Sequence, residues 1–228
     1  MATLYTHQDS NIAKTWILMS VFFAVVVAIG WGVSYYFDNP GILLFAVIFS
    51  VATNIFAYWN SDKVVIAMSG AKPATEAEYR ELNNIVENLA ITAGLPKPKV
   101  YVIQDPAPNA FATGRNKEHA AVAVTTGLLA MMDRAELEGV LAHELSHIGN
   151  RDMLVSTVAV VLVGFVTLVS DFFLRSTLLG GGDDNRNKNP ILMIVAVAFI
   201  VLSPIVATLI QLAISRKREF LADASGAL

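Results

Sequence analysis

Two histidines and a glutamate lie within the five-residue segment His143-Glu144-Leu145-Ser146-His147. On a helix, His143 and His147 share one face because they are four residues apart, so both imidazoles can reach a single metal ion. Glu144 lies close to that face without pointing at the same spot, which suits a base acting on water rather than a ligand. Imidazole and carboxylate ligands favour zinc, which lowers the pKa of a bound water to about 7. The segment therefore predicts zinc-dependent hydrolysis of a peptide carbonyl.

The flanking residues predict that this segment is helical. Asp133 and Glu136 form a capping sequence before a run of periodic apolar residues, and Gly149 is a stop signal after them. A surface helix that carries two histidines without any metal is the alternative interpretation of the same pattern. The metal site is favoured, because the helix start, the apolar periodicity and the helix stop all agree with a motif carried on a helix.

A third ligand is available near the end of the sequence. Glu219 and Asp223 are four residues apart and share a helix face, so Glu219 can complete a His₂Glu site and Asp223 can orient a ligating histidine. A charged helix end at a membrane surface is the alternative for this segment. Two apolar stretches separate His147 from Glu219, and an even number of spans returns the chain to the same side of a bilayer.

The composition indicates a membrane protein. Hydrophobic residues make up 55% of the 228 residues, charged residues only 15%, and the mean hydropathy is +0.56. We expect Asn54, inside the second span, to hydrogen-bond to a neighbouring helix. Each of four apolar stretches is long enough to cross a bilayer, which takes about 20 helical residues: 16–37, 41–59, 154–174 and 191–213.

The distribution of basic residues predicts the orientation of these spans. Six of them fall on the side that carries the N-terminus and the motif, which places both in the cytoplasm, and three fall on the other side. The six are Lys14, Lys63, Arg151, Arg216, Lys217 and Arg218; the three are Arg175, Arg186 and Lys188.

Charge and cysteine usage exclude several classes of function. The chain has no cysteine, so disulfides, cysteine-ligated metals and cysteine nucleophiles are excluded. The formal net charge is -3, and no basic footprint suggests nucleic-acid binding. The oligomeric state is not predictable from these features.

A small α+β layer is expected between the second and third spans. Capping and periodicity predict a helix over 75–93, strands over 99–103, 109–114 and 120–124, and the motif helix from Asp133. The predicted domains are a transmembrane hairpin over 1–60, a catalytic domain over 61–153, a second helix pair over 154–213, and a helix with the third ligand over 214–228.

Several segments together resemble a known family. The motif is followed by Asn150 and Asp152, and later comes Ser215-Arg216-Lys217-Arg218-Glu219-Phe220-Leu221-Ala222-Asp223. Both resemble the HtpX-type membrane metallopeptidases, relatives of the prenyl-protein (CAAX) endopeptidases, and the resemblance covers essentially the whole chain. It implies a multi-pass α-helical membrane protein with a small α+β zincin-like (gluzincin) protease domain. It also implies a bacterial inner-membrane endopeptidase that cleaves misfolded or damaged membrane proteins at the cytoplasmic face during stress.

The resemblance also implies roles for single residues. His143, His147 and Glu219 would bind one zinc ion per chain, and Glu144 would be the catalytic base. Asn109, Ala110 and Phe111 resemble the family's strand beside the active-site cleft and become candidates for pairing with substrate backbone. An ordinary sheet edge is the alternative for this strand.

The sequence stops at Leu228, shortly after Asp223, whereas members of the family usually continue with a further cytoplasmic helical region, so we expect a truncated chain. Two other functions stay open. One is an intramembrane metalloprotease, which the charged residues around the motif argue against. The other is a non-enzymatic membrane scaffold or transporter subunit with an idle metal site.

Overall fold

The structure, a computed structural model of the chain, describes residues 4–150 and 153–179. These residues divide into two compact units. One unit holds residues 4–15, 58–150 and 153–158, and it contains the mixed sheet. The other holds residues 16–57 and 159–179, and it consists of long apolar helices.

Helices α1 (Leu4–Tyr36) and α2 (Pro40–Met68) form a hairpin, as the apolar stretches and the intervening turn predict. The turn places Asp38 at a positive φ of 49°, and the Asn39 side chain accepts a hydrogen bond from the Gly41 amide at 3.0 Å. Along the helices, Gly30 lies so close to Ala46 that no larger side chain fits without displacing it. The absence of a side chain at Gly30 therefore lets the two backbones approach.

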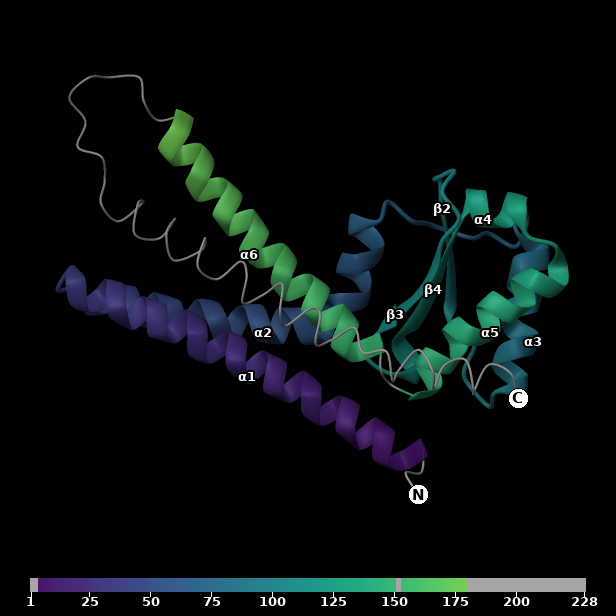
Figure 1. The fold of residues 1–228 in the computed structure, drawn as a ribbon, viewed down its shortest axis with the longest axis horizontal. Coiled ribbons are helices and arrows are strands. Elements are labelled where there is room, and N and C mark those ends of the chain that lie inside the picture. Colours follow the sequence, from purple (N-terminus) through teal and green to yellow (C-terminus); the bar gives the residue numbers. More distant parts are fainter. Residues whose placement is uncertain (1–3, 151–152, 180–228) are drawn as a thin grey trace. The chain divides into compact units, whose positions relative to one another are not determined.

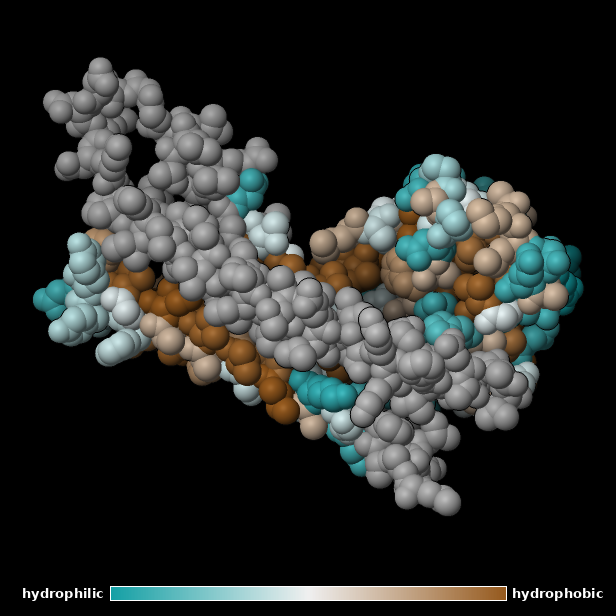
Figure 2. Space-filling model, viewed as in Figure 1, coloured by the Kyte–Doolittle hydropathy of each residue, from teal (hydrophilic) through white to brown (hydrophobic). Residues whose placement is uncertain are grey.

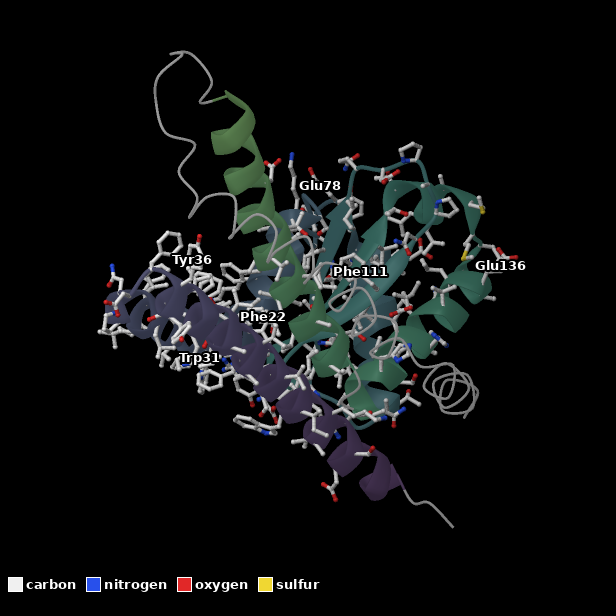
Figure 3. The ribbon with its side chains drawn as sticks, turned by 60° about the vertical axis from the view of Figure 1, so that its left-hand side comes forward. Phe22, Trp31, Tyr36, Glu78, Phe111 and Glu136 are labelled. Atoms are coloured by element: carbon white, nitrogen blue, oxygen red, sulfur yellow. The ribbon has the colours of Figure 1, made fainter. Side chains whose placement is uncertain are left out.

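Both helices of the hairpin are long and apolar enough to cross a membrane. Within the described residues there are two such segments, Asp9–Tyr36 and Pro40–Met68. There are three if helix α5 (Arg134–Asn150) and the segment Met153–Thr167 together form one bent span. Figure 2 shows a largely hydrophobic surface along this hairpin. Trp31 and Tyr36 lie towards one end of α1 (Figure 3), where aromatic side chains suit a membrane interface.

The two remaining predicted spans differ in how far the structure describes them. The third apolar stretch, 154–174, lies within helix α6 (Met153–Leu179). The fourth, 191–213, lies outside the described residues. Inside the hairpin, the buried Asn54 donates a hydrogen bond from Nδ2 to the Met19 carbonyl of α1 at 3.3 Å, which confirms its predicted role between helices.

A four-stranded sheet lies at the centre of the other unit (Figure 1). Its strands are β1 (Lys72–Pro73), β2 (Lys99–Ile103), β3 (Ala110–Gly114) and β4 (Ala120–Thr125), in the order β1-β2-β4-β3. Strands β2 and β4 are parallel, whereas both outer strands pair antiparallel. Strand β1 was not predicted, because two residues that include a proline show no alternation. Strand β3 is an edge strand, so one of its sides has no partner strand in this sheet.

Helices α3 (Arg80–Thr92) and α5 (Arg134–Asn150) pack on one face of this sheet, and the short α4 (Thr126–Met131) follows β4. A short 3₁₀ turn, η1 (Lys117–His119), connects β3 to β4. The predicted α+β layer is therefore present. Its core joins fully buried side chains from β4, α3 and α5, namely Val122, Val124, Ile85, Val86, Leu141, Leu145 and Ile148.

The predicted start of α3 was wrong. The helix begins at Arg80 rather than at Thr75, because the intervening residues form a separate turn in which the Tyr79 amide donates to the Thr75 carbonyl at 2.8 Å. Tyr79 has φ −126° and ψ 44°, outside the helical region. The Thr75 hydroxyl lies 3.4 Å from the Glu78 carboxylate, so the capping sequence does not cap a helix here.

Candidate metal centre

Helix α5 carries the motif, and its first turn is fixed by a reciprocal pair of hydrogen bonds. The Glu136 amide donates to Asp133 Oδ1 at 2.9 Å, and the Asp133 amide donates to Glu136 Oε2 at 3.0 Å. This is the capping box that the sequence predicts. Glu136 lies in the first turn of α5, well away from Phe111 of the sheet (Figure 3). The helix ends at Asn150, one residue beyond the predicted stop at Gly149.

The helical period separates the motif into a core face and a site face. Leu145 and Ile148 are 1% and 0% exposed and pack in the core beneath the sheet. His143, Glu144 and His147 are half-buried on the other side of the helix. Burial of the leucine and isoleucine therefore fixes how α5 is rotated, and that rotation presents the three polar side chains together.

The two histidines point at one spot. Nε2 of His143 and Nε2 of His147 are 3.2 Å apart, and the ring centroids are 4.8 Å apart. Two unprotonated ring nitrogens would repel each other at this distance, so the arrangement suits a cation bound between them. Zn–N bonds of about 2.0–2.1 Å in a tetrahedral site place two ligand nitrogens about 3.3 Å apart. The pair therefore fits zinc with almost no movement.

Glu144 is held by the backbone of the edge strand. Its Oε2 accepts a hydrogen bond from the Ala112 amide of β3 at 3.0 Å. A carboxylate that accepts such a bond is oriented, and one of its oxygens is committed to the strand. The base proposed from the sequence is thus in contact with the sheet edge, on the same helix as the histidine pair.

The hydrogen-bond pattern of β3 shows which of its backbone groups face outwards. Asn109 bonds inwards: its carbonyl accepts from the Thr125 amide at 3.0 Å, and its amide donates to the Thr125 hydroxyl at 2.8 Å. Residues alternate in an antiparallel ladder, so Phe111 also pairs with β4, whereas Ala110 and Ala112 direct their backbone groups away from it. The bond from Ala112 to Glu144 agrees with this alternation.

The structure brings only some of the predicted site residues together. His143, Glu144 and His147 lie on α5, and Glu144 contacts the strand that contains Ala110 and Phe111. Glu219 and Asp223 lie outside the described residues. Among residues 4–150 and 153–179, no group of three or more histidine, cysteine, aspartate or glutamate side chains is placed to hold a metal ion.

Ala112 is a site residue that the sequence reasoning missed. Its contribution is a backbone amide, and every residue except proline has one, so the side chain carries no signal. The only sequence signal is its position two residues after Ala110 in a predicted edge strand, because alternate residues face the same way.

A shallow hollow of about 580 Å³ lies elsewhere on the sheet-containing unit, and none of the predicted site residues lines it. Its lining is polar and comes from α3 and the first turn of α5, namely Arg80, Glu81, Asn84, Glu87, Asn88 and Arg134. Arg134 also bonds to Glu138 at 2.9 Å, and this carboxylate raises the pKa of the guanidinium.

Comparison with known proteins gives a consistent set of relatives. Residues 76–228 match the family described as Peptidase family M48. A Protease HtpX homolog of Caldanaerobacter subterraneus subsp. tengcongensis is 47% identical, over 99% of this chain and 77% of the relative. Proteins with the same description from Thermoanaerobacter pseudethanolicus and Acidiphilium cryptum are both 48% identical, over 99% and 95% of this chain and 77% and 73% of their own lengths.

A solved structure is also similar. The crystal structure of S. mikatae Ste24p superposes with a TM-score of 0.49 at 18% identity, over 98% of this chain and 56% of that chain.

Proposed function

This chain belongs to peptidase family M48 and is a membrane-bound zinc metalloprotease; we propose that His143, His147 and Glu219 bind one zinc ion per chain and that Glu144 is the catalytic base. The 3.2 Å separation of the two Nε2 atoms carries this proposal, because it matches the spacing of two zinc ligands. Glu219 is proposed on its sequence spacing and on the even number of predicted spans between it and His147. Asp223 is proposed to orient one of the ligating imidazoles.

Zinc, when bound, supplies Lewis-acid activation of water and of the peptide carbonyl. Glu144 removes a proton from the attacking water through a carboxylate oxygen and then returns it to the leaving amine. The bond from the Ala112 amide to Oε2 supports this role, because it restricts the rotation of the carboxylate and so fixes its orientation.

We propose that a peptide substrate adds to the edge of β3 as a further strand, along the segment Asn109 to Phe111. Ala110 directs its backbone groups outwards and can pair with a peptide directly. Asn109 and Phe111 use their backbone groups on β4, so they can contact a substrate only through their side chains. This arrangement places the peptide beside Glu144, the residue that the strand itself holds.

The cellular setting follows from the sequence and from the family. We propose a multi-pass protein of the bacterial inner membrane, with a gluzincin-type catalytic domain over 61–153 that faces the cytoplasm between the hairpin over 1–60 and the helix pair over 154–213. The helix over 214–228 would add the third ligand. Misfolded or damaged membrane proteins are the proposed substrates. Family membership does not favour the scaffold, the transporter subunit or the intramembrane protease.

Substitution of the base separates metal binding from catalysis. Glu144→Gln keeps an oxygen that can accept from the Ala112 amide, so the variant should fold and bind about one zinc per chain. Digestion of casein by the purified protein in detergent should fall by at least 10²-fold, the contribution typical of a general base. Glu138→Gln, on the exposed side of the same helix, is the matched control and should digest casein normally. Full activity of Glu144→Gln would exclude Glu144 as the base.

The third ligand needs a separate measurement. Glu219→Ala should lower the zinc affinity about tenfold or more, because one of three protein ligands is lost. Metal analysis during titration with a chelator measures this directly, and Glu118→Ala, at an exposed position, serves as the control. Unchanged affinity would mean that another residue completes the site.

A further inference from the structure

Two buried threonines connect the edge strand to the start of α6. Thr113 of β3 is 1% exposed and Thr157 of α6 is 4% exposed, and their hydroxyl oxygens are 3.1 Å apart. Thr157 belongs to the same compact unit as the sheet. The bond therefore joins a strand of the candidate site to a helix that follows the motif in the chain.

The direction of this bond follows from the other partner of Thr157. The Thr157 hydroxyl donates to the Met153 carbonyl of its own helix at 2.7 Å, which uses its single proton. The Thr113 hydroxyl must therefore be the donor to Thr157. The two hydroxyls form a short chain that runs from the strand into the backbone of α6, and such chains strengthen their members.

Thr113 is the last side chain that anchors β3 before the strand turns away. The next residue, Gly114, has φ 141°, and a side chain there would collide with the His119 carbonyl. At the other end of the strand, Asn109 is fixed by Thr125. The amide that holds Glu144 belongs to Ala112, so it lies next to Thr113 and three residues from the Asn109 anchor.

We propose that the hydrogen bond from Thr113 to Thr157 holds β3 in the position that keeps the Ala112 amide on the Glu144 carboxylate, so that both threonines are positioning residues for peptide cleavage. The inference rests on the proposed role of Glu144. Loss of the side-chain bond at Thr113 should loosen Ala112 more than Ala110, because Ala110 is adjacent to the Asn109 anchor. The chemical step should therefore suffer more than peptide binding.

A matched pair of variants tests this arrangement. Thr157→Val removes the acceptor for Thr113 and the bond to Met153, at nearly constant volume. Thr53→Val is the control: Thr53 is also 4% exposed and donates to the carbonyl four residues earlier at 2.8 Å, a bond that stays within its own helix. Any effect of losing a helical threonine hydroxyl is common to both variants, so their difference reports the bond to β3 alone.

The 228-residue chain in detergent should give two linked readouts. With fluorescein-labelled casein, kcat of Thr157→Val should fall about 2- to 12-fold, the range expected for one hydrogen bond, with KM changed less than about twofold. Hydrogen exchange at the amides of 110–114 should become faster in Thr157→Val and stay unchanged in Thr53→Val. Thr157→Ser, which keeps the hydroxyl, should restore both values.

A second variant separates loss of the hydrogen bond from loss of stability. The double variant Thr113→Val with Thr157→Val leaves no unpaired hydroxyl, so it should be close to wild type in stability and should still show fast exchange and low kcat. If exchange and kcat of both the single and the double variant equal those of Thr53→Val, the proposal is overturned. Lack of casein cleavage by the wild type would refute the proposed function instead, and exchange alone would then decide whether the threonines hold the strand.

Discussion

Leu145 lies between the two histidines in sequence but has a purely structural role. Its side chain is 1% exposed and packs in the core with Leu141, Ile148 and the strand residues Val122 and Val124. The substitution Leu145→Ala leaves His143, Glu144 and His147 unchanged, while it removes the packing that fixes the rotation of α5. It therefore tests whether the helix is held by the core.

The expected cost can be estimated from this burial. Leucine to alanine at a fully buried site costs about 2–5 kcal/mol, through the lost transfer free energy and the cavity that remains. Total stabilities of about 5–15 kcal/mol mean that this is a large fraction of the free energy of unfolding. At about 2–4 °C per kcal/mol for a chain of this size, the Tm should fall by about 4–20 °C.

Thermal unfolding of the purified protein in detergent, followed by intrinsic fluorescence, measures this shift. The volume-conserving Leu145→Met is the control, with an expected cost below about 1.5 kcal/mol. Well below the Tm, Leu145→Ala should still bind zinc and digest casein, because the site residues are intact. A Tm within about 2 °C of the wild type would refute the reasoning, since it would place Leu145 outside a packed core.

Three further substitutions test the elements that support the site. Asp133→Ala removes the side-chain acceptor of the α5 cap and should cost about 0.5–2 kcal/mol, measurable as a lower Tm, whereas Asp133→Ser should retain most of the cap. Gly30→Val should lower the Tm of the helical hairpin by forcing α1 and α2 apart. Gly32→Val should leave the Tm unchanged, because a side chain there meets nothing within 4 Å. Equal effects of the two substitutions would contradict close packing at Gly30. Gly114→Ala should destabilise the β3 end by more than about 1 kcal/mol, because φ 141° suits only glycine, whereas Gly139→Ala, inside α5 with open space around it, should be neutral or stabilising.

Much of the candidate site was predictable because its signals are local. The capping pair Asp133 and Glu136 and the helical period of the apolar residues depend only on neighbours within one or two turns, and α5 forms where they predict it. The hairpin over the first two apolar stretches was predictable for the same reason, since length and hydropathy are properties of the segment itself.

The capping sequence at Thr75 shows where local signals fail. It has the same pattern as the sequence at Asp133, but the chain continues as a turn through Tyr79, whose side chain packs against the core. A tertiary contact there outweighs the small free energy of a cap. The pattern alone could not distinguish the two outcomes.

The sequence by itself identified the candidate residues for the chemistry, and it predicted the helix that carries them and the two apolar helices of the hairpin. Only the tertiary structure decided the strand order β1-β2-β4-β3, the position of the Ala112 amide on Glu144 and the bond between Thr113 and Thr157. These contacts join residues 32 and 44 positions apart. Their formation depends on strand order and on which face of each element is buried, and the packing of the whole unit sets both.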